Sequence, residues 1–241
     1  MHSFPTQIGP EIKDILQNLQ QYEYPGIYIN KEITHKKNLP FLFVLTGPTG
    51  SGKTTFLNYL SSFYHKVTTA TSRQKRDDES DDSYIWMTEK KKENETIDDY
   101  ILRLKEKYYL VETNFFADNV YGTPKSSILS SIQLGNSIIG IDNEGVKSLL
   151  NLENLNVNIV ILFILPDSID SIYKRVNNTR NDLEKRIETA KKELSEASEI
   201  TNYFIHNTEL KIYCDENEIP LERTKYELLN FTRKLIEESN K

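Results

Sequence analysis

The sequence is poor in the residues that build disulfide frameworks and membrane spans. Its 241 residues include one cysteine, Cys214, so a disulfide within the chain and a cysteine-rich metal site are excluded. Residues 1–11 contain no apolar signal core, and the longest apolar run, residues 159–165, is far too short to cross a bilayer. We therefore expect a cytoplasmic protein, in a reducing compartment, with no membrane partner.

Positive charge is also scarce. The chain has 30 Lys and Arg against 36 Asp and Glu, which gives a net charge of -6 and a pI of about 5.4. This balance argues against nonspecific nucleic-acid binding, so no nucleic-acid partner is expected. Hydrophobic residues make up 37%, enough for the core of one sizeable domain or of a core with inserted lobes. No pattern predicts an oligomeric state.

Apolar periodicity predicts an α/β fold with a doubly wound parallel sheet. Short apolar runs predict strands at residues 41–45, 67–70, 108–111, 137–142, 157–165, 203–206 and 210–213. Stripes at helical spacing predict helices at residues 11–21, 56–60, 97–104, 144–150, 183–194 and 228–235, and another that opens at Asp167 or Ser168. We interpret residues 1–40 as an N-terminal extension that packs on the core or links to another part, and residues 41–241 as the main domain.

A complete phosphate-binding motif follows the first buried strand. The pattern Gly47-x-x-x-x-Gly52-Lys53-Thr54 lies between a strand and a helix, which is the context that a Walker A loop requires. Its glycines let backbone N–H groups surround phosphates at a helix N-terminus. Lys53 is expected to bridge the β- and γ-phosphates of ATP, and the Thr54 hydroxyl to hold Mg²⁺. The candidate ATP-binding residues are Gly47, Pro48, Thr49, Gly50, Ser51, Gly52, Lys53, Thr54 and Thr55.

A second set of polar residues follows the predicted strand at 67–70. Arg73 and Arg76 lie three apart in a Ser/Thr-rich loop that suits a phosphate clamp, because each guanidinium is a planar fork of donors. Alone, this pair is better explained as a solvated basic loop. It is followed in order by Tyr84, Glu112, Tyr121-Gly122-Thr123 and Asp142.

The ordered set resembles the guanylate kinase family. That family has a Walker A loop, an Arg-x-x-Arg element, a tyrosine, and a glutamate nine residues before Tyr-Gly-Ser/Thr, the spacing between Glu112 and Tyr121 here. The resemblance covers about residues 41–210. It implies a P-loop NTPase-type core (41–70 and 124–241), an inserted nucleoside-monophosphate-binding lobe (71–123) and a short lid at about 175–186.

The resemblance also implies a reaction, the transfer of the γ-phosphoryl group of ATP, with Mg²⁺, to GMP or dGMP. Arg73, Arg76, Tyr84 and Tyr121 would bind the GMP phosphate, and Thr69 would join the GMP site. Glu112, Thr123 and Asp142 would read the base: carboxylates accept from guanine N1–H and N2–H₂, and a hydroxyl donates to O6. Adenine mismatches this set, and unpaired buried polar groups discriminate strongly.

The chain departs from the family at several places. Gly140 stands where the family has an acid, residues 88–96 form a longer Lys- and Glu-rich loop, and the lid is several residues short. With Lys53, the lid residues Arg175, Arg180 and Arg186 are the catalytic candidates, although Arg186 is equally well explained by a surface salt bridge. A short lid should cover ATP less completely, so slow turnover and some ATP hydrolysis without GMP are expected.

Two other functions remain open at this point. One is a guanylate-kinase-like interaction module with weak or no catalysis, which the short lid and Gly140 leave open. The other is a kinase for a different phosphorylated acceptor, which would not need Glu112, Thr123 and Asp142. The intact Lys53-Thr54 pair favours an enzyme. No catalytic base is required, because the attacking GMP phosphate oxygen is already anionic.

Overall fold

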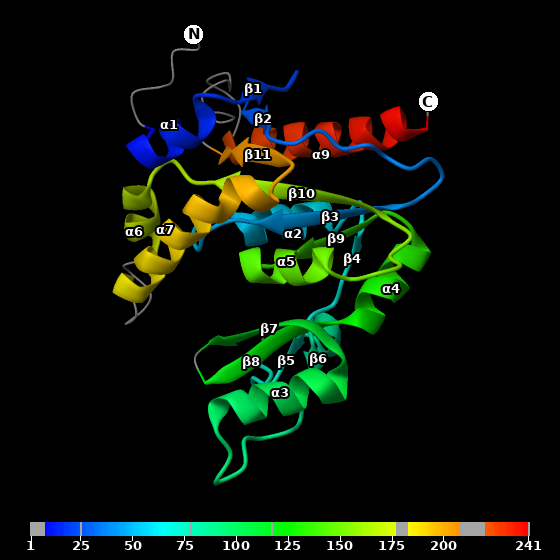
Figure 1. Cartoon of the computed structure of the whole chain (residues 1–241), viewed down its shortest axis with the longest axis vertical. Helices are drawn as coiled ribbons and strands as arrows, with labels where there is room; N and C mark the ends of the chain where they lie inside the picture. Colours follow the sequence, from blue (N-terminus) through cyan, green and yellow to red (C-terminus); the bar gives the residue numbers. More distant parts are fainter. Residues whose placement is uncertain are drawn as a thin grey trace.

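Two β-sheets organise the chain (Figure 1). The computed structural model describes residues 8–240 apart from residues 25, 78, 117, 177–182 and 208–219. The larger sheet has the order β1 (Gln20–Gln21), β2 (Ile27–Ile29), β11 (Tyr203–His206), β10 (Asn158–Leu165), β3 (Phe41–Thr46), β9 (Ser137–Gly140) and β4 (His65–Lys66). The smaller has the order β6 (Ile85–Trp86), β5 (Ala70–Thr71), β8 (Asn119–Pro124) and β7 (Leu110–Phe116).

The centre of the larger sheet is parallel, as the sequence predicts. β10 pairs in parallel with β11 and β3, and β9 pairs in parallel with β3 and β4. Every residue of β3 is buried, because helices cover both faces of such a sheet and leave no solvent-facing side. The α/β fold with a parallel sheet is therefore confirmed.

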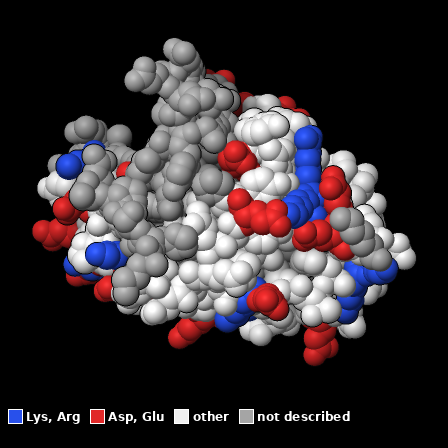
Figure 2. Space-filling view, turned by 90° about the horizontal axis from the view of Figure 1, so that it is seen from above, with Lys and Arg blue, Asp and Glu red and all other residues white. Residues whose placement is uncertain are grey.

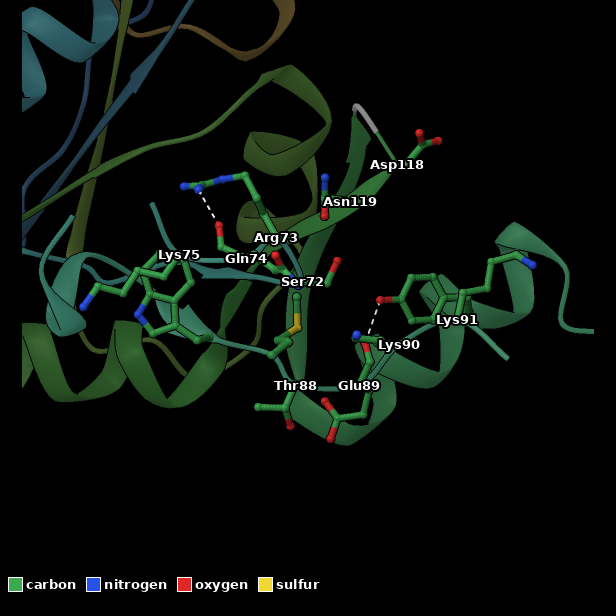
Figure 3. A pocket seen from close by; sticks show the side chains of 13 residues that line it. Ser72, Arg73, Gln74, Lys75, Thr88, Glu89, Lys90, Lys91, Asp118 and Asn119 are labelled. Atoms are coloured by element: carbon green, nitrogen blue, oxygen red, sulfur yellow. Dashed lines mark hydrogen bonds between the residues drawn. The ribbon is translucent and has the colours of Figure 1, made fainter. Parts of the chain in front are cut away.

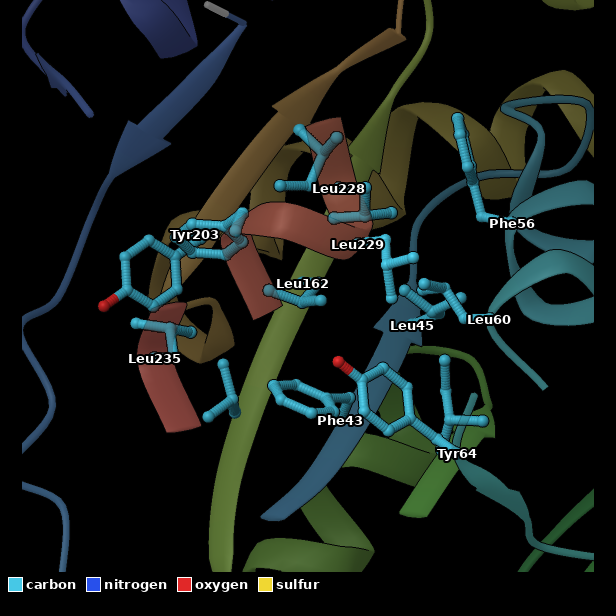
Figure 4. Close-up of a cluster of buried hydrophobic side chains, with 14 of the residues drawn as sticks. Phe43, Leu45, Phe56, Leu60, Tyr64, Leu162, Tyr203, Leu228, Leu229 and Leu235 are labelled. Carbon is cyan, nitrogen blue, oxygen red and sulfur yellow. The ribbon is translucent and has the colours of Figure 1, made fainter. Parts of the chain in front are cut away.

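Helices form a layer on each face of this sheet. They are α1 (Pro10–Leu16), α2 (Lys53–Leu60), α4 (Lys125–Leu134), α5 (Asn143–Leu150), α6 (Ile169–Val176), α7 (Leu183–Ile200) and α9 (Pro220–Ser239). α2 and α9 pack on one face, where Phe56 and Leu229 belong to the same buried cluster as Phe43 of β3 (Figure 4). α4 and α5 pack on the other face through Ile128 and Val146.

The residues before β3 pack on the core. α1 buries Ile12 and Leu16 against Phe163 and Phe204 of the sheet, and β2 extends the sheet by antiparallel pairing with β11. Of the two roles considered for this segment, packing on the core is the one that the structure shows for residues 8–40. Its strands lack a long apolar run, which explains why the sequence did not predict them.

The smaller sheet and α3 (Ile97–Tyr108) form a lobe with its own core. Tyr100 and Leu104 of α3 pack on Leu110 and Val120 of the sheet. The Thr96 side chain caps the helix by accepting from the Asp99 N–H at 3.1 Å. A single 3₁₀ turn, Asp81–Ser83, precedes β6. The predicted helical stripe at 97–104 is confirmed.

Three element predictions need correction. The single strand predicted at 67–70 is wrong, because the chain leaves the larger sheet after β4 and enters the smaller one at β5. The strand predicted at 108–111 begins later, because Tyr109 has φ +50° and ends α3. The helix predicted at 11–21 already ends at Leu16. The strand predicted at 210–213 lies outside the described residues.

The described surface mixes charges of both signs. Acidic and basic side chains lie interspersed over the described part of the face shown in Figure 2. Within the described ranges, no helix is both long and apolar enough to cross a membrane.

Candidate functional site

The phosphate loop joins β3 to α2. Gly47 has φ +128°, and a Cβ there would lie 2.5 Å from the Ile164 carbonyl oxygen of β10, so this position requires glycine. Gly52, with φ +104°, directly precedes α2. Thr54 and Thr55 are exposed in the first turn of that helix. The loop thus places a helix N-terminus and two hydroxyls where an anion can reach them.

The Lys53 ammonium lies over this loop. Its Nζ donates to the carbonyl oxygens of Gly47 and of Pro48, the latter at 3.0 Å. Burial lowers the pKa of Lys53, while the carboxylates of Glu193 and Asp142 raise it. The candidate phosphate-binding lysine is therefore held beside the loop by backbone oxygens and by nearby negative charge.

Side chains from three other elements fix the loop. The Thr46 hydroxyl donates to Asn143 Oδ1 at 3.1 Å, and Asn143 Nδ2 donates to the Glu193 carbonyl oxygen on α7 at 2.9 Å. Asn207 Nδ2 donates to the Ser51 carbonyl oxygen at 3.2 Å. The sequence did not identify Asn143, Glu193 or Asn207. Its only signal was that Asn143 directly follows Asp142.

The three residues predicted to read the base lie close together. Thr123 of β8 donates to Glu112 Oε1 of β7 at 2.7 Å. Asp142 caps α5 by accepting from the Gly145 N–H at 2.8 Å, and its other oxygen accepts from Asn114 Nδ2 of β7 at 2.9 Å. Asp142 is therefore both a helix cap and a link between the core and the lobe.

Glu112 has an unusual environment for an acid. Burial raises the pKa of Glu112 to about 7, and the negative charge of Asp142 adds to this effect, while the Thr123 hydrogen bond opposes it. The positive charge of Lys105 lowers the pKa by less than burial raises it. Donors of a ligand, such as guanine N–H groups, would further stabilise the ionised carboxylate.

The predicted phosphate clamp is partly assembled. Arg73 forms a bidentate ion pair with Glu79, at 2.6 and 3.0 Å, and Glu79 also accepts from the Arg76 N–H at 2.9 Å. The Arg73 guanidinium lies 5.7 Å from the Tyr84 ring centroid. The pKa of Arg73 is raised mainly by Glu79, with a smaller part from the Tyr121 hydroxyl. Arg73 is thus the residue that lies beside both Tyr84 and Tyr121, and it is held by Glu79, which the sequence did not single out.

For two other predicted GMP-site residues, Arg76 and Thr69, we describe no side-chain contact within the site. The Arg76 side chain is exposed. Thr69 is partly buried, and its carbonyl oxygen accepts from the Ile85 N–H at 2.8 Å.

A cavity of ≈ 470 Å³ opens beside Arg73 at the end of the smaller sheet (Figure 3). Ser72, Thr88 and Asn119 are among the residues that line it.

The lid candidates are only partly within the described structure. Arg180 lies outside the described residues, and of Arg175 the backbone alone is described, as part of α6. Arg186 is partly buried in α7. At Gly140, a Cβ would lie 3.1 Å from Leu57 Cδ2 of α2, so a side chain there would require Leu57 to shift.

Comparisons with known proteins point to one family. The family model described as guanylate kinase matches residues 40–222. The guanylate kinase of Desulfitobacterium hafniense is 30% identical over 189 residues, covering 75% of this chain and 88% of the relative. That of Clostridium acetobutylicum is 32% identical over 182 residues, covering 72% and 80%.

A solved structure supports the fold. The crystal structure of guanylate kinase from Anaplasma phagocytophilum superposes with a TM-score of 0.55 at 22% identity and covers 84% of this chain and 89% of that one. At this identity the likeness concerns the fold alone. The family model extends over most of the chain, from the end of the N-terminal segment into α9, and includes every candidate site residue. This chain therefore belongs to the guanylate kinase family.

Proposed function

We propose that this chain transfers the γ-phosphoryl group of ATP to GMP or dGMP. The observation that carries the proposal is the position of Asp142, which acts on Lys53 of the phosphate loop and on Glu112 of the lobe. One carboxylate thus lies between a donor site for ATP and an acceptor site with hydrogen-bonding groups suited to guanine. A module that only binds a partner would need no such junction.

The acceptor site would be formed by the lobe. Glu112 would accept from guanine N–H groups, and the Thr123 hydroxyl, which now donates to Glu112, would turn to O6. Arg73, held in place by Glu79 and beside Tyr84 and Tyr121, would bind the phosphate dianion. Arg76 would join it on binding. These contacts fix the attacking oxygen, and no protein base is required.

The donor site would be formed by the phosphate loop. The N–H groups of residues 49–55, at the N-terminus of α2, would hold the ATP phosphates, and Lys53 would move from the carbonyls of Gly47 and Pro48 to the β- and γ-phosphates. The exposed Thr54 hydroxyl would hold Mg²⁺, which would neutralise phosphate charge when bound. Among the described residues no group of three or more His, Cys, Asp or Glu could hold a metal.

A coupled assay of ADP formation tests the proposal. GMP and dGMP should support turnover, and AMP, CMP and UMP should be at least about a hundredfold poorer in kcat/KM. Comparable turnover of AMP would contradict the guanine assignment. ADP formation from none of the five would favour an interaction module.

A further inference from the structure

Asn114 of β7 joins the lobe to the core through its side chain. Its Nδ2 donates to Asp142 Oδ2 at 2.9 Å, and the side chain is exposed. β7 lies on the side of the lobe that is turned towards α5 (Figure 1). Asn114 therefore contacts one of the carboxylates proposed to read the base, although neither the phosphate clamp nor the base-reading set includes it.

The strand register places Asn114 on the same face of the smaller sheet as the acceptor residues. Asn114 pairs with Tyr121 of β8, and residues opposite each other in antiparallel strands project to the same face. Glu112 and Thr123 lie two residues from this pair along their strands, and their side chains are hydrogen-bonded at 2.7 Å. A Cβ at Gly145 of α5 would lie 3.2 Å from Glu112 Cγ, so this face is the one turned towards the core.

The two ends of a bound nucleotide would lie on either side of Asn114. The base would be held at Glu112, which precedes Asn114 on this face. The phosphate would be held at Arg73, where the Tyr121 hydroxyl acts on the guanidinium and the Tyr84 ring lies 5.7 Å away. Because the ribose joins base and phosphate in every nucleotide, Asn114 is the side chain placed to meet the ribose.

The bond to Asp142 fixes the orientation of the Asn114 amide. An ionised carboxylate only accepts hydrogen bonds, so the amide nitrogen must face Asp142 and the amide oxygen must face away from it. This oxygen is an acceptor, and the hydroxyls of the ribose are donors. The 2′-hydroxyl is attached to the carbon next to the base, and Asn114 borders both carboxylates proposed to bind the base.

We propose that Asn114 is a specificity-determining residue of the acceptor site, whose Oδ1 accepts from the ribose 2′-hydroxyl and so favours GMP over dGMP. This inference rests on the proposed binding of GMP to the lobe and names the sugar that the site prefers. With dGMP the amide oxygen has no donor, and the contribution of one neutral hydrogen bond is lost. KM for dGMP should therefore be about threefold to tenfold higher than KM for GMP.

Steady-state ADP formation by the unmodified protein gives the first test. GMP, dGMP and 2′-deoxy-2′-fluoro-GMP place a donor, a hydrogen and a group that cannot donate at the same position. KM for the fluoro compound should match that for dGMP. If it matches that for GMP instead, or if GMP and dGMP have equal KM, the inference is overturned and the proposed function stands. ADP formation with none of the three contradicts the proposed function itself.

Matched variants give the second test. Asn114→Ala should remove the preference, by raising KM for GMP to the value for dGMP while KM for dGMP and KM for ATP stay unchanged. Thr113→Ala is the control, because the neighbouring side chain projects to the opposite face of the sheet, and it should retain the preference for GMP. If Asn114→Ala raises KM for both nucleotides alike, Asn114 serves only to position Asp142 and the inference fails. It fails equally if the variant keeps the preference for GMP.

Discussion

Glu112 shows how a single side chain can oppose folding and serve binding. Its pKa is raised from the ordinary value of 4.5 to about 7. The unfolded chain therefore ionises at lower pH than the folded protein, and the free energy of unfolding falls as pH rises from 4.5 to about 7. Glu112→Gln should therefore increase the free energy of unfolding of the ligand-free protein at pH 8 by about 1–2 kcal/mol, with no gain near pH 4. Chemical denaturation at the two pH values measures this.

The same variant should bind GMP less well. Loss of a charged acceptor for guanine N–H groups should cost about 1–3 kcal/mol in GMP binding, measured by calorimetry. In the unmodified protein, GMP affinity should increase between pH 6 and pH 8 as Glu112 ionises. Unchanged GMP affinity in Glu112→Gln would show that Glu112 has no role in reading the base.

Substitution of Lys53 should distinguish the role of the ATP site from that of the GMP site. Lys53→Ala should abolish ADP formation, because the ammonium that would neutralise the β- and γ-phosphates is removed. GMP binding should persist, because the acceptor residues lie in the lobe and in the Asp142 cap. An ADP assay and GMP calorimetry on the same preparation check both parts. Loss of GMP binding by a folded variant would contradict this division.

Sequence reasoning at this scale identified residues through motif and order. It found Lys53, Glu112 and Thr123, which the structure places in the phosphate loop and in one hydrogen-bonded pair. It missed Glu79, because an acid in a polar stretch looks solvated until the fold shows which cation faces it.

At the scale of elements, the loop between β5 and β6 is organised around Glu79. The carboxylate uses two nitrogens of Arg73 and the Arg76 N–H, and the guanidinium retains further donors for phosphate. Glu79→Gln should loosen this arrangement and weaken GMP binding by about fivefold, measured by calorimetry. Asp81→Asn, which removes an exposed ion pair with Lys75 in the same loop, is the matched control. Tighter GMP binding in Glu79→Gln would instead mean that Glu79 competes with the phosphate.

The lid prediction comes from the sequence alone. Arg180→Ala should lower kcat with little change in GMP affinity, the behaviour of a contact made mainly in the transition state. Steady-state kinetics with GMP measure it, and Arg186→Ala in α7 is the comparison. If kcat is unaffected in Arg180→Ala, Arg175 or Arg186 becomes the better candidate.

Element boundaries were less predictable than element identity. Apolar runs identified β3 and β10, whose residues are buried on both faces of the sheet. The break between β4 and β5 could not be predicted, since residues 67–70 are apolar or β-prone throughout. Only strand pairing shows that β4 ends before this run, in the larger sheet, and that β5 begins at Ala70, in the smaller sheet.

For the whole molecule, the N-terminal segment is an integral part of the core. Deletion of residues 1–32 would remove Ile12, Leu16, Ile27 and Tyr28, all nearly fully buried, and would expose the edge of β11. Each such side chain contributes about 1.5–3 kcal/mol, so the melting temperature should fall by more than about 10 °C. Thermal unfolding measures this, with deletion of residues 1–7 as the control. An unchanged melting temperature would contradict the structural role.

The lobe interrupts the core at two neighbouring points. The chain leaves the larger sheet after β4 and returns at α4, and these two elements pack together, while the lobe keeps a hydrophobic cluster of its own. Because the two ends of the lobe lie side by side, the lobe could be replaced by a short linker between β4 and α4 without altering the strand order of the larger sheet. The molecule is thus modular, and the residues proposed to bind the acceptor, apart from Asp142 at the cap of α5, could be exchanged by transplanting one contiguous stretch of sequence.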